Sequence, residues 1–337
     1  DLGFFQERLG FVVTYYDRST KNQILGVEIS STTGYNNQRL NAGEIRNYGV
    51  ELLLKAMPGR LDNGFRWNVT MNWSKNNSEV VDLYGDLKTL RLGGQWSMNV
   101  EARKGEPYGL FFGNGYLECP NPDYADRCAG MKDGTWLLDS SGRPQRDTNR
   151  RVLGNYNPDW LGGIQNRFSY GSFDLSVLVD GQRGGDIFSI TNWFGEYAGV
   201  LKSTLRGREN DFCDPGIVVD GVLPDGSMNG DGVNDVTVCP QSYFGRNYGN
   251  QEASIFDATY IKLREVRLGY QLPSSWVARM GFSSGSVALI GRSLLLYSPN
   301  APNIDPETAV DPSNGQGLES GQFPTARSIG ITFTITP

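Results

Sequence analysis

The clearest pattern along the chain is a strict alternation of apolar and polar residues between Phe65 and Ser74. Successive side chains of a β-strand point to opposite faces, so this period of two predicts a strand with two unlike faces. The apolar face carries Phe65, Trp67, Val69, Met71 and Trp73, and the polar face carries Arg66, Asn68, Thr70, Asn72 and Ser74.

A second alternating stretch runs from Phe256 to Pro273, where the proline cannot extend a ladder of hydrogen bonds. Its apolar positions are Ile261, Leu263, Val266, Leu268 and Tyr270. The alternation slips by one residue at Glu265, which predicts a β-bulge. Basic side chains occupy the other face, so this strand also requires two different environments.

Further strands are expected in both halves of the chain. The stronger candidates are residues 8–17, 41–56, 160–170, 172–182, 285–298 and 326–336, and the weaker ones are 24–29, 95–102 and 105–116. Residues 57–59 (Met-Pro-Gly) are expected to turn, and 186–197 reads as a strand or a helical turn. This makes about ten strands without a long helix.

The connections are strongly unequal in length. A tight turn is expected at Gly171, whereas 117–156 and 198–254 read as long polar loops. Short turns on one side and long loops on the other are typical of outer-membrane barrels. Two architectures fit alternating strands, a soluble sandwich and an antiparallel transmembrane β-barrel with long extracellular loops. Serine, threonine, glycine and lone charges suit a wet lumen better than a dry core, which favours the barrel.

Composition narrows the choice further. No apolar run approaches the ~20 residues of a membrane helix. The chain has 31 basic and 37 acidic residues and a net charge of −6, which argues against a nucleic-acid binder. It contains no histidine, so the commonest general base and the histidine-dependent triads are missing. We therefore expect no catalytic residues and no enzymatic activity.

The four cysteines fall into two pairs within loops rich in proline, aspartate and glycine. The pairs are Cys119 with Cys128 and Cys213 with Cys239. Two local disulfides in an oxidising compartment are the simpler interpretation. A metal site is the alternative, but the spacings fit no zinc pattern and no histidine is available.

Residues 227–235 (SMNGDGVND) are similar to calcium loops in which oxygen ligands alternate around a glycine turn. The expected ligands are Asn229, Asp231, the Val233 carbonyl and Asp235, with Asp225 as a further candidate. Ser227 stands where such loops begin with aspartate, which would weaken the site. The alternative is a turn rich in glycine and aspartate that binds no metal.

Three segments near the end of the chain resemble, in order, the C-terminal barrel strands of the SusC/RagA family of TonB-dependent outer-membrane transporters. They are residues 258–273 (ATYIKLREVRLGYQLP), the segment 291–307 that ends in Asp-Pro-Glu, and 324–333. Residues 41–54, 72–83, 105–116 and 153–185 agree with the family in the same order. Two departures are Arg292-Ser293-Leu294, where the family pattern usually has asparagine before leucine, and a chain end without a terminal aromatic residue.

The resemblance implies that residues 1–337 are the C-terminal portion of a larger barrel of about 22 strands, whose plug domain is not in this chain. A chain that begins at Asp1 is expected to be a mature product or a piece of a longer polypeptide. Candidate lumen-facing residues are Arg66, Arg167, Lys262, Arg264 and Arg267, although a solvated charged face would look the same.

The function implied is import of oligomeric nutrients, glycans or peptides, across the outer membrane of a Gram-negative cell. The expected partners are a SusD-like surface lipoprotein over the long loops, TonB through the absent plug, and outer-membrane lipid. No nucleic acid and no cofactor other than calcium is expected. The alternative is a surface structural or adhesive protein whose loops are stapled by disulfides and calcium and which does not transport.

Overall fold

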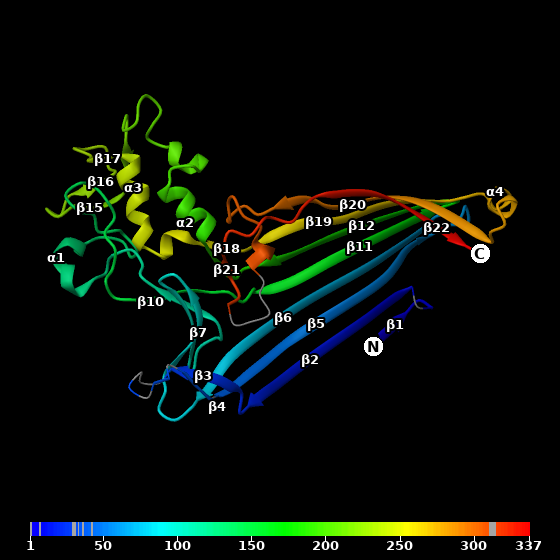
Figure 1. Ribbon diagram of the computed structural model, residues 1–337, viewed down its shortest axis with the longest axis horizontal. Coiled ribbons are helices and arrows are strands. Elements are labelled where there is room, and N and C mark those ends of the chain that lie inside the picture. The colour runs from blue at the N-terminus through cyan, green and yellow to red at the C-terminus, as the bar shows by residue number, and fades with distance from the viewer. Residues whose placement is uncertain are drawn as a thin grey trace.

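The computed structural model describes residues 2–6, 8–28, 32, 34–35, 37–41, 43–309 and 315–337. Its main element is an antiparallel nine-stranded sheet that is open rather than closed into a barrel (Figure 1). The strands, in spatial order, are β1 (Leu2–Phe4), β2 (Leu9–Lys21), β5 (Gly43–Arg60), β6 (Arg66–Leu83), β11 (Trp160–Tyr170), β12 (Phe173–Arg183), β19 (Tyr260–Gln271), β20 (Ser284–Tyr297) and β22 (Ser328–Thr336).

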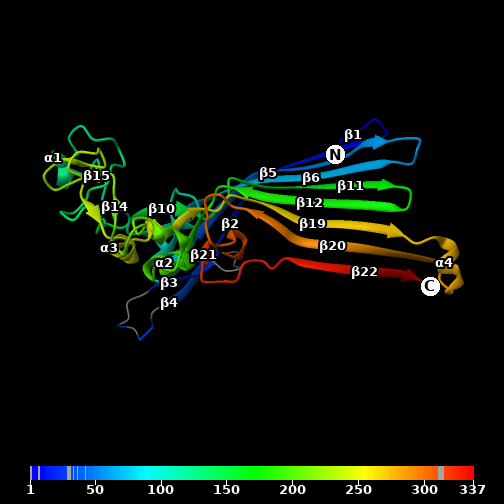
Figure 2. The same ribbon diagram turned by 90° about the horizontal axis from the view of Figure 1, so that it is seen from above.

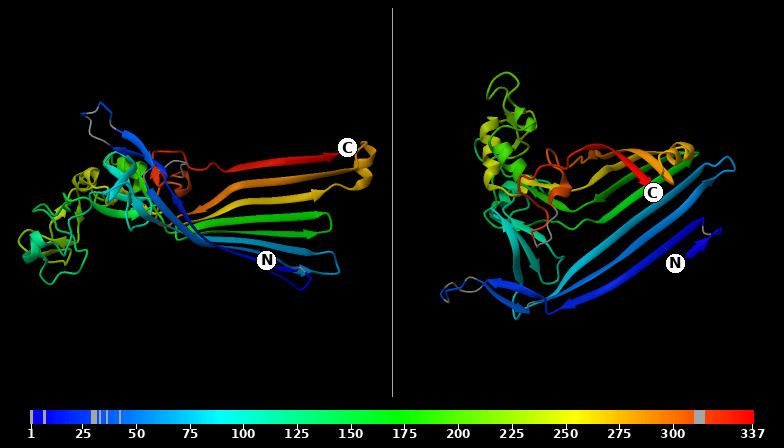
Figure 3. Two further views of the ribbon diagram at one scale, coloured as in Figure 1. Left: turned by 90° about the horizontal axis from the view of Figure 1, so that it is seen from below. Right: turned by 45° about the vertical axis from the view of Figure 1, so that its right-hand side comes forward.

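The sheet lies as a curved wall, with the hairpin turns together at one end (Figures 2 and 3). The turn between β11 and β12 is short, as predicted, whereas the connection from β19 to β20 contains a helix, α4 (Ser274–Arg279). A short turn after Pro273, where the ladder was expected to end, would match the turn at Gly171, but the residues after the proline instead form a helical turn that buries Val277. None of the helices in the described part of the chain is long and apolar enough to span a membrane.

The long connections, residues 84–159, 184–259 and 298–327 as far as they are described, fold at the other end of the wall. We call them the loop head. It contains a four-stranded sheet and several short helices (Figure 1). Its longer elements are β7 (Thr89–Gln95), β8 (Met98–Arg103), β9 (Leu110–Gly113), β10 (Arg151–Asn155), α1 (Ala125–Cys128), α2 (Ile190–Tyr197) and α3 (Pro240–Arg246).

Shorter elements complete the loop head and the adjoining rim of the wall. They are the hairpin β3 (Ile24–Glu28) with β4 (Asn37–Asn41), the pairs β14 (Ile217–Val218) with β17 (Thr237–Val238) and β15 (Gly221–Val222) with β16 (Met228–Asn229), and a sheet of β13 (Asp186–Ser189), β18 (Ile255–Asp257) and β21 (Leu318–Glu319). The last residue of the predicted strand 24–29 lies outside the described residues.

Four predictions about single elements need correction. Residues 57–59 are not a turn but an irregularity within β5, where the register shifts between Ala56 and Gly59 and so tolerates a proline. Residues 95–102 are not one strand, because the chain reverses at Trp96 between β7 and β8. Only Leu110–Gly113 of the segment 105–116 is extended. The segment 186–197 is both a strand, β13, and a helix, α2.

The pairing register places most apolar side chains of the long strands on one face, with exceptions such as Leu53 and Leu178. One row across the sheet consists of Phe11, Leu54, Met71, Ile164, Val179, Leu263 and Leu295. Nothing in the described part of the chain covers this outer face. Leu295 is 60% exposed and Phe333 71% exposed, whereas large buried side chains such as Phe111 and Phe188 lie in the loop head. This is the reverse of a soluble sandwich, in which the apolar face would form the core.

Aromatic residues mark both ends of the outer face. Tyr170, Phe173, Tyr270 and Phe333 lie near the turn end, and Trp73, Trp160 and Tyr297 lie near the loop head. The strand β11 has 11 residues, and its ends are therefore about 33 Å apart along the strand. A strand of this length, tilted by the ~40° typical of outer-membrane barrels, would span about 25 Å of the bilayer.

One polar side chain interrupts the apolar face. Asn166 lies between Val69 and Val177, and its amide oxygen accepts a hydrogen bond from the Trp67 indole N–H at 3.1 Å. The Trp67 ring also stacks on Phe168 at 5.7 Å between centroids. The indole therefore satisfies the one polar group in this part of the face.

Replacing Trp67 with phenylalanine is expected to lower the free energy of unfolding by about 1–3 kcal/mol, because the Asn166 oxygen loses its donor in an apolar setting. Trp73→Phe, on the same face of β6, is the matched control. Adding Asn166→Val to the Trp67→Phe variant should recover most of the loss. Denaturant titration in detergent or lipid measures all four proteins. Equal losses for Trp67→Phe and Trp73→Phe would contradict the role of this hydrogen bond.

Candidate functional site

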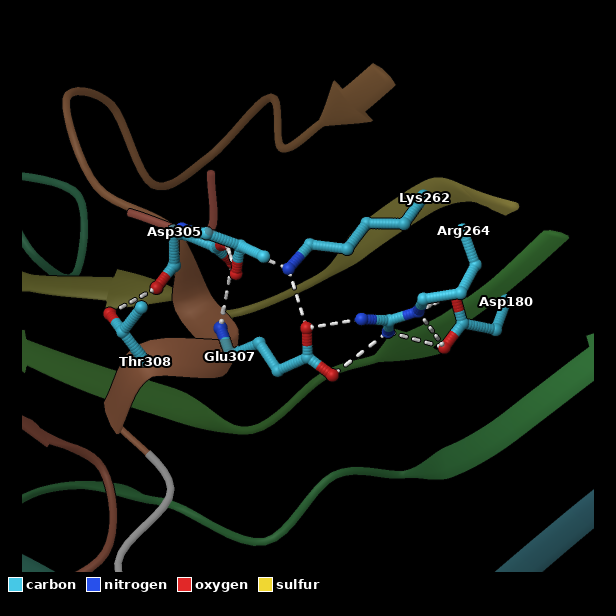
Figure 4. A network of polar contacts seen from close by, with 7 residues as sticks. Asp180, Lys262, Arg264, Asp305, Glu307 and Thr308 are labelled. Carbon is cyan, nitrogen blue, oxygen red and sulfur yellow. Dashed lines mark hydrogen bonds and ion pairs between the residues drawn. The ribbon is translucent and has the colours of Figure 1, made fainter. Parts of the chain in front are cut away.

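The polar face of the wall carries a compact charge cluster near the loop head (Figure 4). The Lys262 ammonium donates to Asp305 at 2.7 Å and to Glu307 at 2.6 Å. The Arg264 guanidinium donates to Asp180 at 2.5 Å and to Glu307 at 2.7 Å. Three carboxylates thus surround two cations, and Glu307 bridges both.

Local structure explains how these residues meet. A bulge opposite Leu178 and Val179 inserts Arg264 as an extra residue of β19 between Leu263 and Glu265. Lys262 and Arg264 are two residues apart and therefore lie on the same face, where Arg264 bonds Asp180 of β12. The extra residue brings Glu265 to that face as well and returns Val266 to the outer face. The slip predicted at Glu265 is thus confirmed to within one residue.

The two acidic partners come from the loop between β20 and β22. A turn of 3-10 helix, Pro306–Ala309, follows Asp305, whose Oδ1 accepts the Glu307 backbone N–H at 3.1 Å. The Asp305 Oδ2 also accepts from the Thr325 hydroxyl at 2.7 Å. Lys262 and Asp305 are almost completely buried, with exposed fractions of 1% and 2%. The cluster therefore fastens this loop to the wall.

Both loop carboxyls have depressed pKa values. Burial acts to raise the pKa of Asp305, but hydrogen bonds from Lys262 and Thr325 outweigh burial and hold that pKa below its usual value. Burial opposes the same change at Glu307, whose pKa is lowered by its bonds from Arg264 and Lys262. The ion pairs are therefore intact at neutral pH.

A second group of charged residues lies on the same face, farther from the loop head. The Arg267 guanidinium pairs with Asp174, and Arg292 pairs with Glu265 at 2.8 Å. A cavity of about 360 Å³ beside them is also lined by Arg167. Arg167 of β11 pairs in register with Ser176 of β12 on one side and with Asn68 of β6 on the other. Arg66 lies two residues before Asn68 and therefore on the same face of β6.

These positions place all five sequence-predicted basic residues, Arg66, Arg167, Lys262, Arg264 and Arg267, on the polar face of the wall. The structure brings Lys262 and Arg264 into one cluster and Arg167 and Arg267 around one cavity. Neither Arg66 nor Arg167 has an ion-pair partner within the described residues. The acidic partners Asp180, Asp305 and Glu307 were missed, although Asp305 and Glu307 belong to the Asp-Pro-Glu segment used in the resemblance.

In the loop head, the structure joins Cys119 to Cys128 and Cys213 to Cys239. The Arg127 guanidinium, next to one disulfide, donates to the carbonyls of Leu138 and Val222. Val222 lies within the loop closed by the other disulfide. Arg127 therefore ties the two disulfide-closed loops together.

The sequence-predicted calcium ligands lie close together but bond to the backbone. The Asn229 side chain is fully buried and bonds Val219, Val236 and no acidic residue. Asp231 accepts from the Val233 N–H, and Asp235 accepts from the N–H groups of Gly230 and Gly232. Asp225 accepts from Ser227.

Asn229 therefore does not fit as a ligand where it lies, and Asp231, Asp235 and the Val233 carbonyl remain. The described residues contain no group of three or more aspartate, glutamate or cysteine side chains arranged to hold a metal. Calcium binding stays a prediction. If calcium binds, EDTA should increase the protease sensitivity of residues 225–236, and unchanged sensitivity would contradict calcium binding.

Replacing Asp305 with asparagine is expected to release the loop 298–327, because buried Lys262 loses half of its negative partners. The same release should follow acidification. A depressed pKa stabilises the folded state above the usual carboxyl values of about 3.9 and 4.3, and this stabilisation is lost as pH falls through the lower folded values. Hydrogen exchange of residues 298–309 and 315–327 measures both effects.

Asp86→Asn, at an exposed carboxyl outside the cluster, is the control and should leave exchange unchanged. Protection of the loop that is the same in Asp305→Asn as in the unmodified protein, from pH 7 to pH 3, would show that the cluster does not hold the loop.

Comparison with known proteins gives the same picture. No protein-family model matches the chain. The chain is 28% identical over 357 residues to TonB-dependent receptor P26 of Formosa agariphila, with 100% of the chain and 33% of that receptor covered. It is 25% identical over 352 residues to TonB-dependent receptor P3 of the same organism, with 99% and 32% covered.

The fold is similar to solved structures of a transporter. Over 98% of the chain it superposes on 33% of a chain of the RagAB peptide transporter, with a TM-score of 0.69 and 18% identity. For the RagAB peptide importer in the closed-closed state the TM-score is 0.68 and the identity 20%. The chain spans about a third of the length of these proteins. These findings bear out the resemblance: the chain is similar over its whole length to TonB-dependent receptors and has the fold of the RagAB transporter structures.

Proposed function

We propose that this chain forms part of the barrel wall of an outer-membrane importer, with its polar face lining the path of oligomeric nutrients. The observation that carries the proposal is the uncovered apolar face between two aromatic ends. The 11 residues of β11 between these ends are the length that a transmembrane β-strand needs, and aromatic girdles flank the apolar band of outer-membrane barrels on both sides. Lipid is the solvent that such a face requires.

The two ends of the wall support one orientation. Outer-membrane barrels have short periplasmic turns and long extracellular loops. The turn end, with the hairpin at Gly171, would then lie in the periplasm and the loop head outside the cell (Figure 2). Both disulfides lie in the loop head, in keeping with an oxidising environment.

The polar face suits a lumen that handles polar cargo. It carries ion-paired charges near the loop head and the partnerless guanidiniums of Arg66 and Arg167 toward the periplasmic end, as far as the described residues show. Guanidinium groups bind carboxylates in two-point contacts, and these two would bind the cargo or the plug. The cargo class proposed is glycans or peptides.

The proposed partners follow from the relatives. Similarity to TonB-dependent receptors supports coupling to TonB through a plug domain. Similarity to RagAB supports a SusD-like surface lipoprotein seated over the loop head. The receptor would act as a transporter without covalent chemistry, since its relatives carry the names of receptors and transporters.

Placing an arginine in the middle of the outer face is expected to cost about 2–4 kcal/mol, because the charge would face the bilayer midplane. Val69→Arg tests this, and Thr70→Arg, the next residue of β6 on the polar face, is the matched control. The full receptor carrying Val69→Arg should be depleted from the outer membrane, whereas Thr70→Arg should assemble. Fractionation with folding-dependent gel mobility measures assembly. Equal assembly of both variants would contradict the contact between lipid and the outer face.

The transport function is tested in cells that lack the full receptor. Their uptake of labelled oligosaccharides or oligopeptides should fall to background and return with the receptor gene. Removing TonB should abolish the same uptake. Unchanged uptake of both cargo classes, together with a loss of surface adhesion, would favour a structural or adhesive protein instead.

A further inference from the structure

The wall has a gap in its strand pairing just below the loop head. The pairing of β6 with β11 ends at Ser74 with Leu161, and the next contact on that side of β6 is the bridge between Glu79 and Pro107. Residues 75–78 of β6 pair only with β5 within the described part of the chain. We call this gap the rim slit.

A cavity of about 420 Å³ occupies the rim slit. The outer-face pair Leu52–Trp73 is followed, at intervals of two residues, by the pairs Val50–Lys75 and Tyr48–Asn77. Tyr48, Lys75 and Asn77 therefore lie on the outer face of the wall. The other side of the cavity is formed by residues 155–159, which lead directly into Trp160. Asn76 and Ser78 reach the cavity from the polar face, so the rim slit is lined from both faces of the wall, immediately above the aromatic end formed by Trp73 and Trp160.

That level is where the headgroups of the outer leaflet lie if the wall sits in the membrane as proposed. Indole rings occupy the boundary between hydrocarbon and headgroups. A cavity one or two residues above them is within reach of a headgroup whose acyl chains pack on the apolar face. The height alone therefore favours a lipid as the occupant.

The lining has the chemistry of a sugar site. Its polar side chains are amides, carboxylates, a hydroxyl and one ammonium. Glu79 faces Arg46 of β5, and the following have no side-chain hydrogen bond or ion pair in the described part of the chain: Lys75, Asn77, Ser78, Glu106 and Asp159. Amide groups both donate and accept hydrogen bonds and carboxylates accept them, so together they can bind neighbouring hydroxyls of a sugar. The aromatic ring of Tyr48 lies at the same cavity.

The strand edge adds donors and acceptors of its own. Backbone N–H and C=O groups of residues 75–78 that point away from β5 have no backbone partner within the described residues. Polar backbone groups near a membrane boundary require a partner, which water or a hydroxylated headgroup can supply.

We propose that the rim slit binds the sugar headgroup of an outer-leaflet glycolipid, with its acyl chains on the outer face beside β6 and β11. The hydroxyls bond Asn77, Ser78 and the open strand edge, and Lys75 donates to a further hydroxyl. Three carboxylates, Glu79, Glu106 and Asp159, line the slit against one ammonium, so the headgroup that fits carries no negative charge. The proposal rests on the membrane orientation proposed above, and it adds a lipid site in the gap between β6 and β11.

The test uses the full receptor in mixed micelles and three probes. They are a lipid with an uncharged disaccharide headgroup, phosphatidylethanolamine, and the free disaccharide. Native mass spectrometry counts bound molecules. We expect one disaccharide lipid per receptor, with weaker retention of phosphatidylethanolamine and of the free sugar.

Asn77→Ala should weaken retention of the disaccharide lipid about fivefold, because one side chain of the headgroup contact is lost. Asn72→Ala, the same substitution on the polar face of the same strand, is the matched control and should bind as the unmodified receptor does. Ser78→Trp should fill the cavity and abolish retention.

Three results would overturn the proposal. They are equal retention of phosphatidylethanolamine, binding of the free sugar as tight as that of the lipid, and unchanged retention in both Asn77→Ala and Ser78→Trp. Any of these, with normal depletion of Val69→Arg from the membrane, would reject the lipid site and leave the membrane wall intact.

Discussion

The structure depends on one constraint, the pairing register that nine strands share. The side-chain period of a strand is two, so a slip of one residue at any pair would move the apolar set of that strand to the polar face. The rows hold from β2 to β20, so that Val13, Trp73 and Ile261 lie at one level of the same face. Shared register thus turns separate amphipathic strands into one wall with two chemically different sides.

The same constraint explains why the bulge in β19 matters. The regular alternation places Lys262 and Arg264 on the polar side, and the inserted residue adds Glu265 to them and returns Val266 to the outer face. Buried charges are costly unless they are paired and hydrogen-bonded. Lys262 is 1% exposed and has two carboxylate partners, so the loop that supplies Asp305 and Glu307 is required for this part of the wall. Two basic side chains of one strand therefore fix the path of a loop about 40 residues later.

How much of the structure could be predicted from the sequence depends on whether the interacting residues are close together or far apart in the chain. Alternation at residues 65–74 and 256–273 is local, and it was enough to predict the strands, the two faces and the slip near Glu265. The partners of Lys262 and Arg264 could not be predicted, because Asp180 and Glu307 are distant in sequence and meet only through strand order. The reversal at Trp96 was missed for a similar reason, since a tryptophan with φ of 52° is not a turn signal.

The wall and the loop head are stabilised in different ways. The loop head has apolar clusters of its own, for example around Phe111, Phe188 and Trp193, and its two disulfides close loops that Arg127 ties together. The wall buries few apolar side chains, and its outer face gains stability only where lipid replaces water. Substitutions in the loop head should therefore act as in a soluble domain, whereas those on the outer face act through the membrane. The rim slit lies at the boundary between these two regimes, where strand pairing with the wall has ended and packing in the loop head has not begun.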